Sequence, residues 1–134
     1  MEREVDRSKL LKGAAGEEVA CRLLVEKGYR ILDRNYSERI GELDIVCSRD
    51  ETIVFVEVRS ATTRYLSSPV VTIDARKQQH IVRTAQAYLM RRGLNHRETR
   101  FDVIGVLMGG GETKTEWLQD AFRPESTARK GKFR

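Results

Sequence analysis

The segment that most constrains the fold is residues 52–59, which is apolar on both faces of a predicted strand. Alternate residues of an extended chain point to opposite sides, so Ile53 and Phe55 share one face and the intervening valines share the other. Such a strand must be covered on both sides, as in the centre of an α/β sheet. Glu57 and Arg59 nevertheless stand at its end, on the face of Ile53. A carboxylate buried there costs several kcal/mol unless it is paired or coordinates a metal.

The remaining segments predict an α/β fold. In chain order they are a helix over residues 9–27, strands over 29–36, 41–48 and 52–59, a loop over 62–71, a helix over 73–92, and strands over 99–107 and 114–118. Apolar residues recur at helical spacing in both helices. Gly28 and Gly93 follow them as typical helix-ending residues. We therefore predict one mixed sheet flanked by two helices.

Basic charge is concentrated at the C-terminal end of the chain. The net charge is +5, but residues 123–134 hold five basic residues and one acidic residue, a net of +4, which leaves 20 basic and 19 acidic residues in 1–122. A length of 134 residues suits one domain. We predict a single domain over 1–122 and a basic, disordered tail over 123–134. The high isoelectric point of the chain, about 9.5, therefore comes mostly from the basic residues of this tail. It indicates a nucleic-acid partner only weakly.

Features of export and membrane insertion are not expected. The first residues are charged, and the longest apolar runs are only a few residues, so we expect neither a signal peptide nor a membrane span. Cys21 and Cys47 match no metal-ligand spacing and are expected to be core residues in a reducing compartment. These observations predict a soluble cytoplasmic protein.

The strand over residues 41–48 also carries acidic residues among apolar ones. Glu42 and Asp44 are expected on one face of it, and Leu43 and Ile45 on the other. Directly opposed residues of an antiparallel pair point to the same side of the sheet. A two-residue turn at 50–51 would place Asp44 opposite Glu57, and a four-residue turn would place Glu42 there. A three-residue turn would oppose Glu57 to Leu43 and disperse the carboxylates. Either even-numbered turn predicts three carboxylates on one patch.

Two interpretations of this acidic patch remain open on the charge pattern alone. Carboxylates brought together need a cation or a raised pKa. Oxygen donors without His or Cys suit Mg²⁺ or Mn²⁺ rather than zinc. In the other interpretation, Asp44 and Glu57 pair with Arg59 and Arg39 as an ordinary buried salt-bridge network.

Residues 41–46, Gly-Glu-Leu-Asp-Ile-Val, followed by 54–59, Val-Phe-Val-Glu-Val-Arg, resemble the YraN-like family of bacterial proteins. That family is similar in fold to archaeal Holliday-junction resolvases and to the wider PD-(D/E)XK nuclease superfamily. Further agreement comes from residues 16–20, 28–29, Lys77 and 100–103. The resemblance covers roughly residues 10–120 and implies a restriction-endonuclease-like fold.

The resemblance also implies an activity and a set of site residues. Asp44 and Glu57 would be the ligands of Mg²⁺ or Mn²⁺, with the backbone carbonyl of Val58 completing the site. The implied activity is a structure-selective, metal-dependent endonuclease acting on DNA. Glu17 matches the acidic residue that the first helix contributes, although Glu18 could take this role, or Glu17 could be an ordinary solvated residue.

A nucleic-acid-facing surface is implied on the second helix. Its basic residues are Arg76, Lys77, Arg83, Arg91 and Arg92. Lys77 matches the family residue that approaches the site, and Arg76 and Arg83 suit contact with phosphates. The alternative is an ordinary solvated helix face. We expect the nucleic acid to be DNA rather than RNA. By analogy with resolvase-like relatives, we also expect a homodimer. Asp102 is expected to make a structural hydrogen bond.

The sequence departs from the nuclease pattern at Arg59, where the motif has lysine. An arginine remains charged at physiological pH and cannot act as a base. It can still stabilise charge on a phosphate, while the metal generates hydroxide from its own bound water. The alternatives are a non-catalytic nucleic-acid-binding module on a degenerate nuclease fold and a protein-interaction adaptor.

Overall fold

The computed structural model describes residues 7–61 and 73–124, without the side chains of residues 7–12. The elements are α1 (Arg7–Glu26), β1 (Arg30–Glu38), β2 (Gly41–Arg49), β3 (Thr52–Ala61), α2 (Ala75–Arg91), β4 (Glu98–Leu107) and β5 (Lys114–Phe122). The predicted order of elements is confirmed, and β5 runs further than predicted. The predicted loop over residues 62–71 and residues 125–134 of the predicted tail lie outside the described residues.

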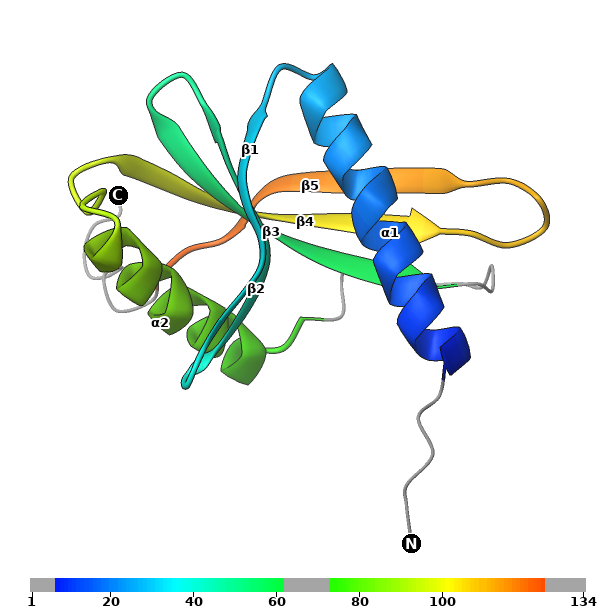
Figure 1. Cartoon of the computed structure of the whole chain (residues 1–134), viewed down its shortest axis with the longest axis horizontal. Coiled ribbons are helices and arrows are strands. Elements are labelled where there is room, and N and C mark those ends of the chain that lie inside the picture. Colours follow the sequence, from blue (N-terminus) through cyan, green and yellow to red (C-terminus); the bar gives the residue numbers. More distant parts are fainter. Residues whose placement is uncertain (1–6, 62–72, 125–134) are drawn as a thin grey trace, which may run out of the picture.

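The five strands form one mixed sheet in the spatial order β1-β2-β3-β4-β5 (Figure 1). β3 pairs in parallel with β4, and all other neighbours are antiparallel. A parallel pair needs a crossover connection, and α2 lies in it. α1 and α2 pack against opposite faces of the sheet. This α/β arrangement is consistent with the predicted restriction-endonuclease-like fold.

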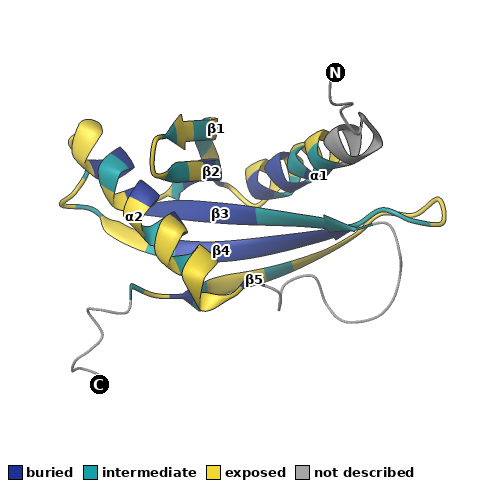
Figure 2. Cartoon of the chain, turned by 90° about the horizontal axis from the view of Figure 1, so that it is seen from below, coloured by how far each residue is buried: buried dark blue, intermediate teal, exposed yellow. Residues whose placement is uncertain are grey.

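β3 is the central strand and is covered on both faces, as predicted. Ile53 and Phe55 pack in the core beneath α2, whereas Val54 and Val56 pack in the core beneath α1. Figure 2 shows burial along much of β3 and β4, while β5 is largely exposed at the edge. The charged end of β3 therefore emerges from a segment that is buried on both sides.

The turn between β2 and β3 has two residues, because the ladder begins at Arg49↔Thr52. Asp50 in this turn has a φ of 55°, a left-handed conformation that aspartate tolerates. This is one of the two even turn lengths considered from the sequence. Continuing the register brings Asp44 level with Glu57, as predicted for a two-residue turn.

β2 does not alternate strictly along its length. Leu43 packs with Val46 beneath α2, whereas Ile45 packs beneath α1, so the prediction that Leu43 and Ile45 share a face is wrong. The irregularity lies beside Asn35 of β1, which has a left-handed φ of 54°. Such a residue locally distorts a strand ladder and interrupts its simple alternation.

Two glycines allow the helices to approach the sheet closely. A Cβ on Gly16 of α1 would lie 2.0 Å from Oγ and 3.2 Å from Cβ of Ser60 in β3. On the other face, a Cβ on Gly41 of β2 would lie 2.7 Å from Oγ1 of Thr84 in α2. Both helices therefore reach the part of the sheet where β2 and β3 separate.

A buried carboxylate fastens the edge strand β5. Asp102 is fully buried and accepts two hydrogen bonds from the Arg100 guanidinium, at 2.9 and 2.8 Å. It also accepts bonds from Nε1 of Trp117 and from the backbone N–H of Asp120, each at 2.9 Å. These donors satisfy the carboxylate, so the structural role predicted for Asp102 is confirmed.

No helix in the described part of the chain is long and apolar enough to cross a bilayer.

We predict opposite effects for two alanine substitutions in α1. Gly16→Ala should lower the free energy of unfolding by about 1–3 kcal/mol, because the new methyl group collides with Ser60. Gly13→Ala should raise it by about 0.5–1 kcal/mol, because nothing lies within 4 Å of the added Cβ and alanine favours the helix. Urea unfolding measures both changes. Similar effects from the two variants would contradict the close approach at Gly16.

Candidate active site

β2 and β3 stop pairing at the level of Asp44 and Glu57. Their ladder ends at Ile45↔Val56, while β3 continues beside β4. Just beyond this point, Oδ2 of Asp44 accepts a hydrogen bond of 2.8 Å from the backbone N–H of Val58. A side chain of β2, rather than its backbone, therefore makes this contact with β3, and it brings two carboxyl groups together.

The environment of Asp44 favours its protonated form. Burial raises the pKa of Asp44 from 3.8 to about 7, and the negative charge of Glu57 adds to the rise. The hydrogen bond from Val58 and the positive charge of Lys77 act in the opposite direction but are outweighed. The carboxyl groups of Asp44 and Glu57 also hydrogen-bond to each other. The pair therefore binds a proton more readily than two separate carboxyl groups, first because it is buried and second because the two groups repel each other.

Glu57 is paired with a lysine from α2. Its side chain is only 8% exposed, and its Oε2 lies 3.2 Å from Nζ of Lys77. The backbone N–H of Lys77 donates a 2.9 Å hydrogen bond to the helix cap, Asp74. Lys77 is thus brought to the acidic pair, as the resemblance implied. The salt-bridge interpretation had assigned Arg59 and Arg39 as partners, and the ion pair found at Glu57 involves Lys77.

Of the two glutamates considered in α1, Glu17 lies beside the pair. Burial raises the pKa of Glu17, and the nearby charge of Asp44 contributes to the rise, while a hydrogen bond with Asn35 lowers it. Glu18 instead pairs with Arg34 at 3.3 Å. Adjacent helical residues point in different directions, and here only Glu17 turns toward Asp44.

The acidic group is a pair rather than the predicted trio. Glu42 is exposed, and the described residues contain no group of three or more carboxylate, imidazole or thiol side chains placed to hold a metal. Arg59 is half-buried near the end of β3 and interacts with another group. The central members of the site are therefore Asp44 and Glu57, with Glu17 and Lys77 next to them.

The donors present suit a hard divalent cation. Asp44, Glu57 and the carbonyl of Val58 offer only oxygen atoms, which Mg²⁺ and Mn²⁺ prefer. Mg²⁺ is commonly held by one or two carboxylates together with water and substrate phosphate. A cation would also offset the repulsion between the two carboxyl groups that contributes to the raised pKa of Asp44. The residues therefore fit the implied metal.

The basic residues of α2 have different surroundings. Arg91 lies 2.8 Å from Glu38, and Arg92 lies 3.0 Å from Asp33, so these two arginines tie α2 to β1. Arg76 and Arg83 make no ion pair within the described part of the chain. Both arginines are therefore available to an external anion.

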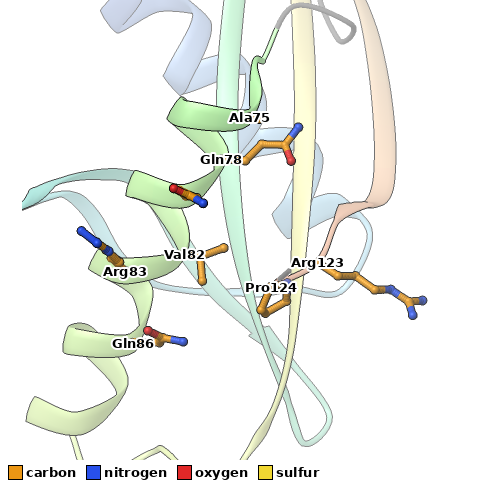
Figure 3. Close-up of a pocket in the computed structure, with 8 residues that line it drawn as sticks. Ala75, Gln78, Val82, Arg83, Gln86, Arg123 and Pro124 are labelled. Atoms are coloured by element: carbon orange, nitrogen blue, oxygen red, sulfur yellow. The ribbon is translucent and has the colours of Figure 1, made fainter. Parts of the chain in front are cut away.

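Arg83 lines a groove of about 750 Å³ between α2 and the end of β5 (Figure 3). The other lining residues are Ala75, Gln78, Gln79, Val82, Gln86, Arg123 and Pro124. None of these described lining residues is acidic. Figure 3 shows Arg83 and Arg123 pointing away to opposite sides of the groove, and Arg123 is itself paired with Asp120 at 2.6 Å.

The sequence matches the model of the family described as "Uncharacterised protein family UPF0102" over residues 16–106. The chain belongs to this family. UPF0102 is the YraN family, so the resemblance inferred from the sequence motifs is confirmed. The part that matches the UPF0102 model includes Glu17, Asp44, Glu57 and Lys77.

Relatives named UPF0102 protein are similar over most of their length. The protein of Moorella thermoacetica is 45% identical over 113 residues, covering 83% of this chain and 94% of the relative. That of Nitrosococcus oceani is 38% identical over 116 residues, covering 86% and 94%. That of Myxococcus xanthus is 41% identical over 110 residues, covering 82% and 87%.

We predict that the metal-free protein loses stability as the pH rises from about 4 to about 7. Over this range folded Asp44 retains a proton that the unfolded chain has released, so the folded state binds more protons. Asp44→Asn should flatten this dependence and stabilise the protein by about 1–2 kcal/mol at pH 8. The carboxamide can still accept the hydrogen bond from Val58 and donate one to Glu57. Urea unfolding across this pH range measures the effect.

The control for this measurement is Asp50→Asn in the exposed turn between β2 and β3, which should keep the pH dependence of the wild type. If Asp44→Asn is as pH-dependent as the wild type, the raised pKa of Asp44 is wrong.

Proposed function

We propose that this UPF0102 protein is a metal-dependent, endonuclease-like protein that hydrolyses DNA phosphodiesters. The observation that carries the proposal is the pairing of Asp44 with Glu57 where β2 leaves β3, on a restriction-endonuclease-like sheet. Burial of two adjacent carboxyl groups costs stability, and a role in binding a cation explains why the site contains them.

Each residue would have a distinct part in the reaction. Asp44, Glu57 and the carbonyl of Val58 would hold Mg²⁺ or Mn²⁺. The ion would lower the pKa of a bound water and polarise the phosphodiester. Glu17 would orient a water beside Asp44, and Arg59 would stabilise negative charge on the phosphate.

The overall reaction adds water across one phosphorus–oxygen ester bond. The water oxygen bonds to phosphorus, the ester bond breaks, and the leaving oxygen takes up a proton.

DNA would be held mainly through its backbone. Two arginines support this mode of binding. Arg76 and Arg83 make no ion pair in the described region, and Arg83 lines a groove that has no acidic lining residue. The net charge of +4 in residues 123–134 adds a long-range attraction for a polyanion. Contacts of this kind position a duplex without reading its sequence, which suits a nuclease that selects DNA by shape.

Arg59 favours a second candidate function, a nucleic-acid-binding module on a degenerate nuclease fold. The motif lysine is missing at this position, and arginine cannot replace it as a proton acceptor. In this case the acidic pair would remain without a catalytic role.

We predict that the wild type binds Mn²⁺ and that Asp44→Ala loses this binding, as measured by titration calorimetry. Cleavage of branched and linear DNA in the presence of Mn²⁺ should fall by about 100-fold or more in the same variant. Glu18→Ala, in which the neighbouring glutamate of α1 is removed, is the matched control and should keep both properties.

The outcomes separate the two candidates. A wild type that binds no Mn²⁺ contradicts the metal site. If the wild type binds DNA without cutting it, and Arg59→Lys creates cleavage, the degenerate-module function replaces the nuclease.

We predict that Arg83→Gln weakens DNA binding and lowers the slope of log affinity against log salt by about 1, because one phosphate contact is lost. Fluorescence anisotropy with a labelled duplex at several salt concentrations measures both. Arg22→Gln on α1 removes the same charge from an arginine that pairs with Glu18, and it should change the slope little. Equal slopes for Arg83→Gln and the wild type would exclude the groove as a DNA contact.

A further inference from the structure

The ammonium of Lys77 lies at the entrance to the acidic pair. Its Nζ is 3.2 Å from Oε2 of Glu57, yet the Lys77 side chain is 48% exposed while that of Glu57 is 8% exposed. The lysine therefore stands between a buried carboxylate and the solvent. An anion that approaches Glu57 from the solvent comes within reach of this ammonium.

The position of Lys77 in α2 breaks a local rule of helix stability. Arg76 and Lys77 are the second and third residues after the cap Asp74, and the first turn contains no acidic residue. Cations near a helix N-terminus are repelled by the helix dipole. Residues that break such rules concentrate at functional sites. The helix dipole and the Lys77 ammonium both favour an anion at this end of α2.

Lys77 is also held from two directions before any substrate binds. Its backbone N–H is fixed by the 2.9 Å hydrogen bond to Asp74. The missing side chain of Gly41 lets α2 sit against β2, since a Cβ there would lie 2.7 Å from Oγ1 of Thr84. The flexible stem of the lysine therefore starts from a fixed position above the end of β3, and only its tip needs to move.

We propose that Lys77 is a catalytic residue of this site and supplies from α2 the lysine that β3 lacks at Arg59. Without substrate its ammonium rests on Glu57. With substrate it donates a hydrogen bond to a non-bridging oxygen of the scissile phosphate and offsets the charge that develops there. It donates a hydrogen bond and transfers no proton, so the proton balance of hydrolysis is unchanged. A compact ammonium on a flexible stem suits this movement better than a planar guanidinium. The assignment rests on the proposed nuclease function.

The first test compares Lys77→Met with Lys27→Met, which removes the same charge from an exposed residue just beyond α1. We expect Lys77→Met to lower kcat by about 100-fold with a smaller change in KM, because the contact strengthens as negative charge develops in the transition state. Lys27→Met should cleave like the wild type. A Lys77→Met variant that keeps kcat within about threefold of the wild type overturns the proposal.

Calorimetry with Mn²⁺ shows where Lys77 acts. Binding retained by Lys77→Met supports action on the phosphate. Binding lost in this variant overturns the proposal, because Lys77 would then serve the metal ligands instead.

The second test follows the contact itself and does not need cleavage. Acetylation of Lys77 in the wild type is measured by mass spectrometry with Lys27 as the internal reference. Mn²⁺ should increase labelling of Lys77 by freeing it from Glu57, and a short DNA duplex added with non-cleaving Ca²⁺ should protect it. If the wild type never cuts DNA, the proposed nuclease function fails, and protection by DNA still supports the Lys77 contact. Lys77 labelling that DNA does not change overturns the contact.

Discussion

Glu57 stands at the end of a strand that is buried on both faces, and Asp44 reaches the same level from the neighbouring strand. Two carboxyl groups in such a place repel each other and lose their hydration, so the structure must supply positive charge or a proton. It supplies both in part, through Lys77 and through the raised pKa of Asp44. The neutralisation of the two carboxyl groups is therefore incomplete, and a bound divalent cation would complete it.

The two helices approach the pair through positions that lack side chains. Gly16 lets α1 lie against β3, which brings Glu17 toward Asp44 on one face. Gly41 lets α2 lie against β2, which brings Lys77 to Glu57 on the other face. The close packing of each helix against the sheet therefore also determines where its charged residue lies. A helix held further from the sheet by even one methyl group would carry its charged residue away with it.

Some of this site follows from the sequence because its causes are local. Side-chain alternation and turn length were enough to predict that Asp44 could face Glu57. The choice between Glu17 and Glu18 was not local, because it depends on how α1 is rotated above the sheet. The charge pattern of the two strands could not predict the partner of Glu57 either, because Lys77 belongs to the helix of the crossover connection. The displaced face of Leu43 reflects the backbone of another strand, which no pattern within β2 could reveal.

The crossover also sets an order in which the site can be completed. β2 and β3 are joined by a two-residue turn, whereas β3 and β4 are separated in the sequence by the much longer crossover connection that contains α2. Short hairpins form quickly, and parallel pairs across long connections form late. A growing chain on the ribosome also emerges with both carboxylates before the lysine. We therefore expect newly made and partly folded molecules to have an acidic pair without its lysine. If the protein cuts DNA, this order keeps unfinished molecules harmless until the last parallel contact is made.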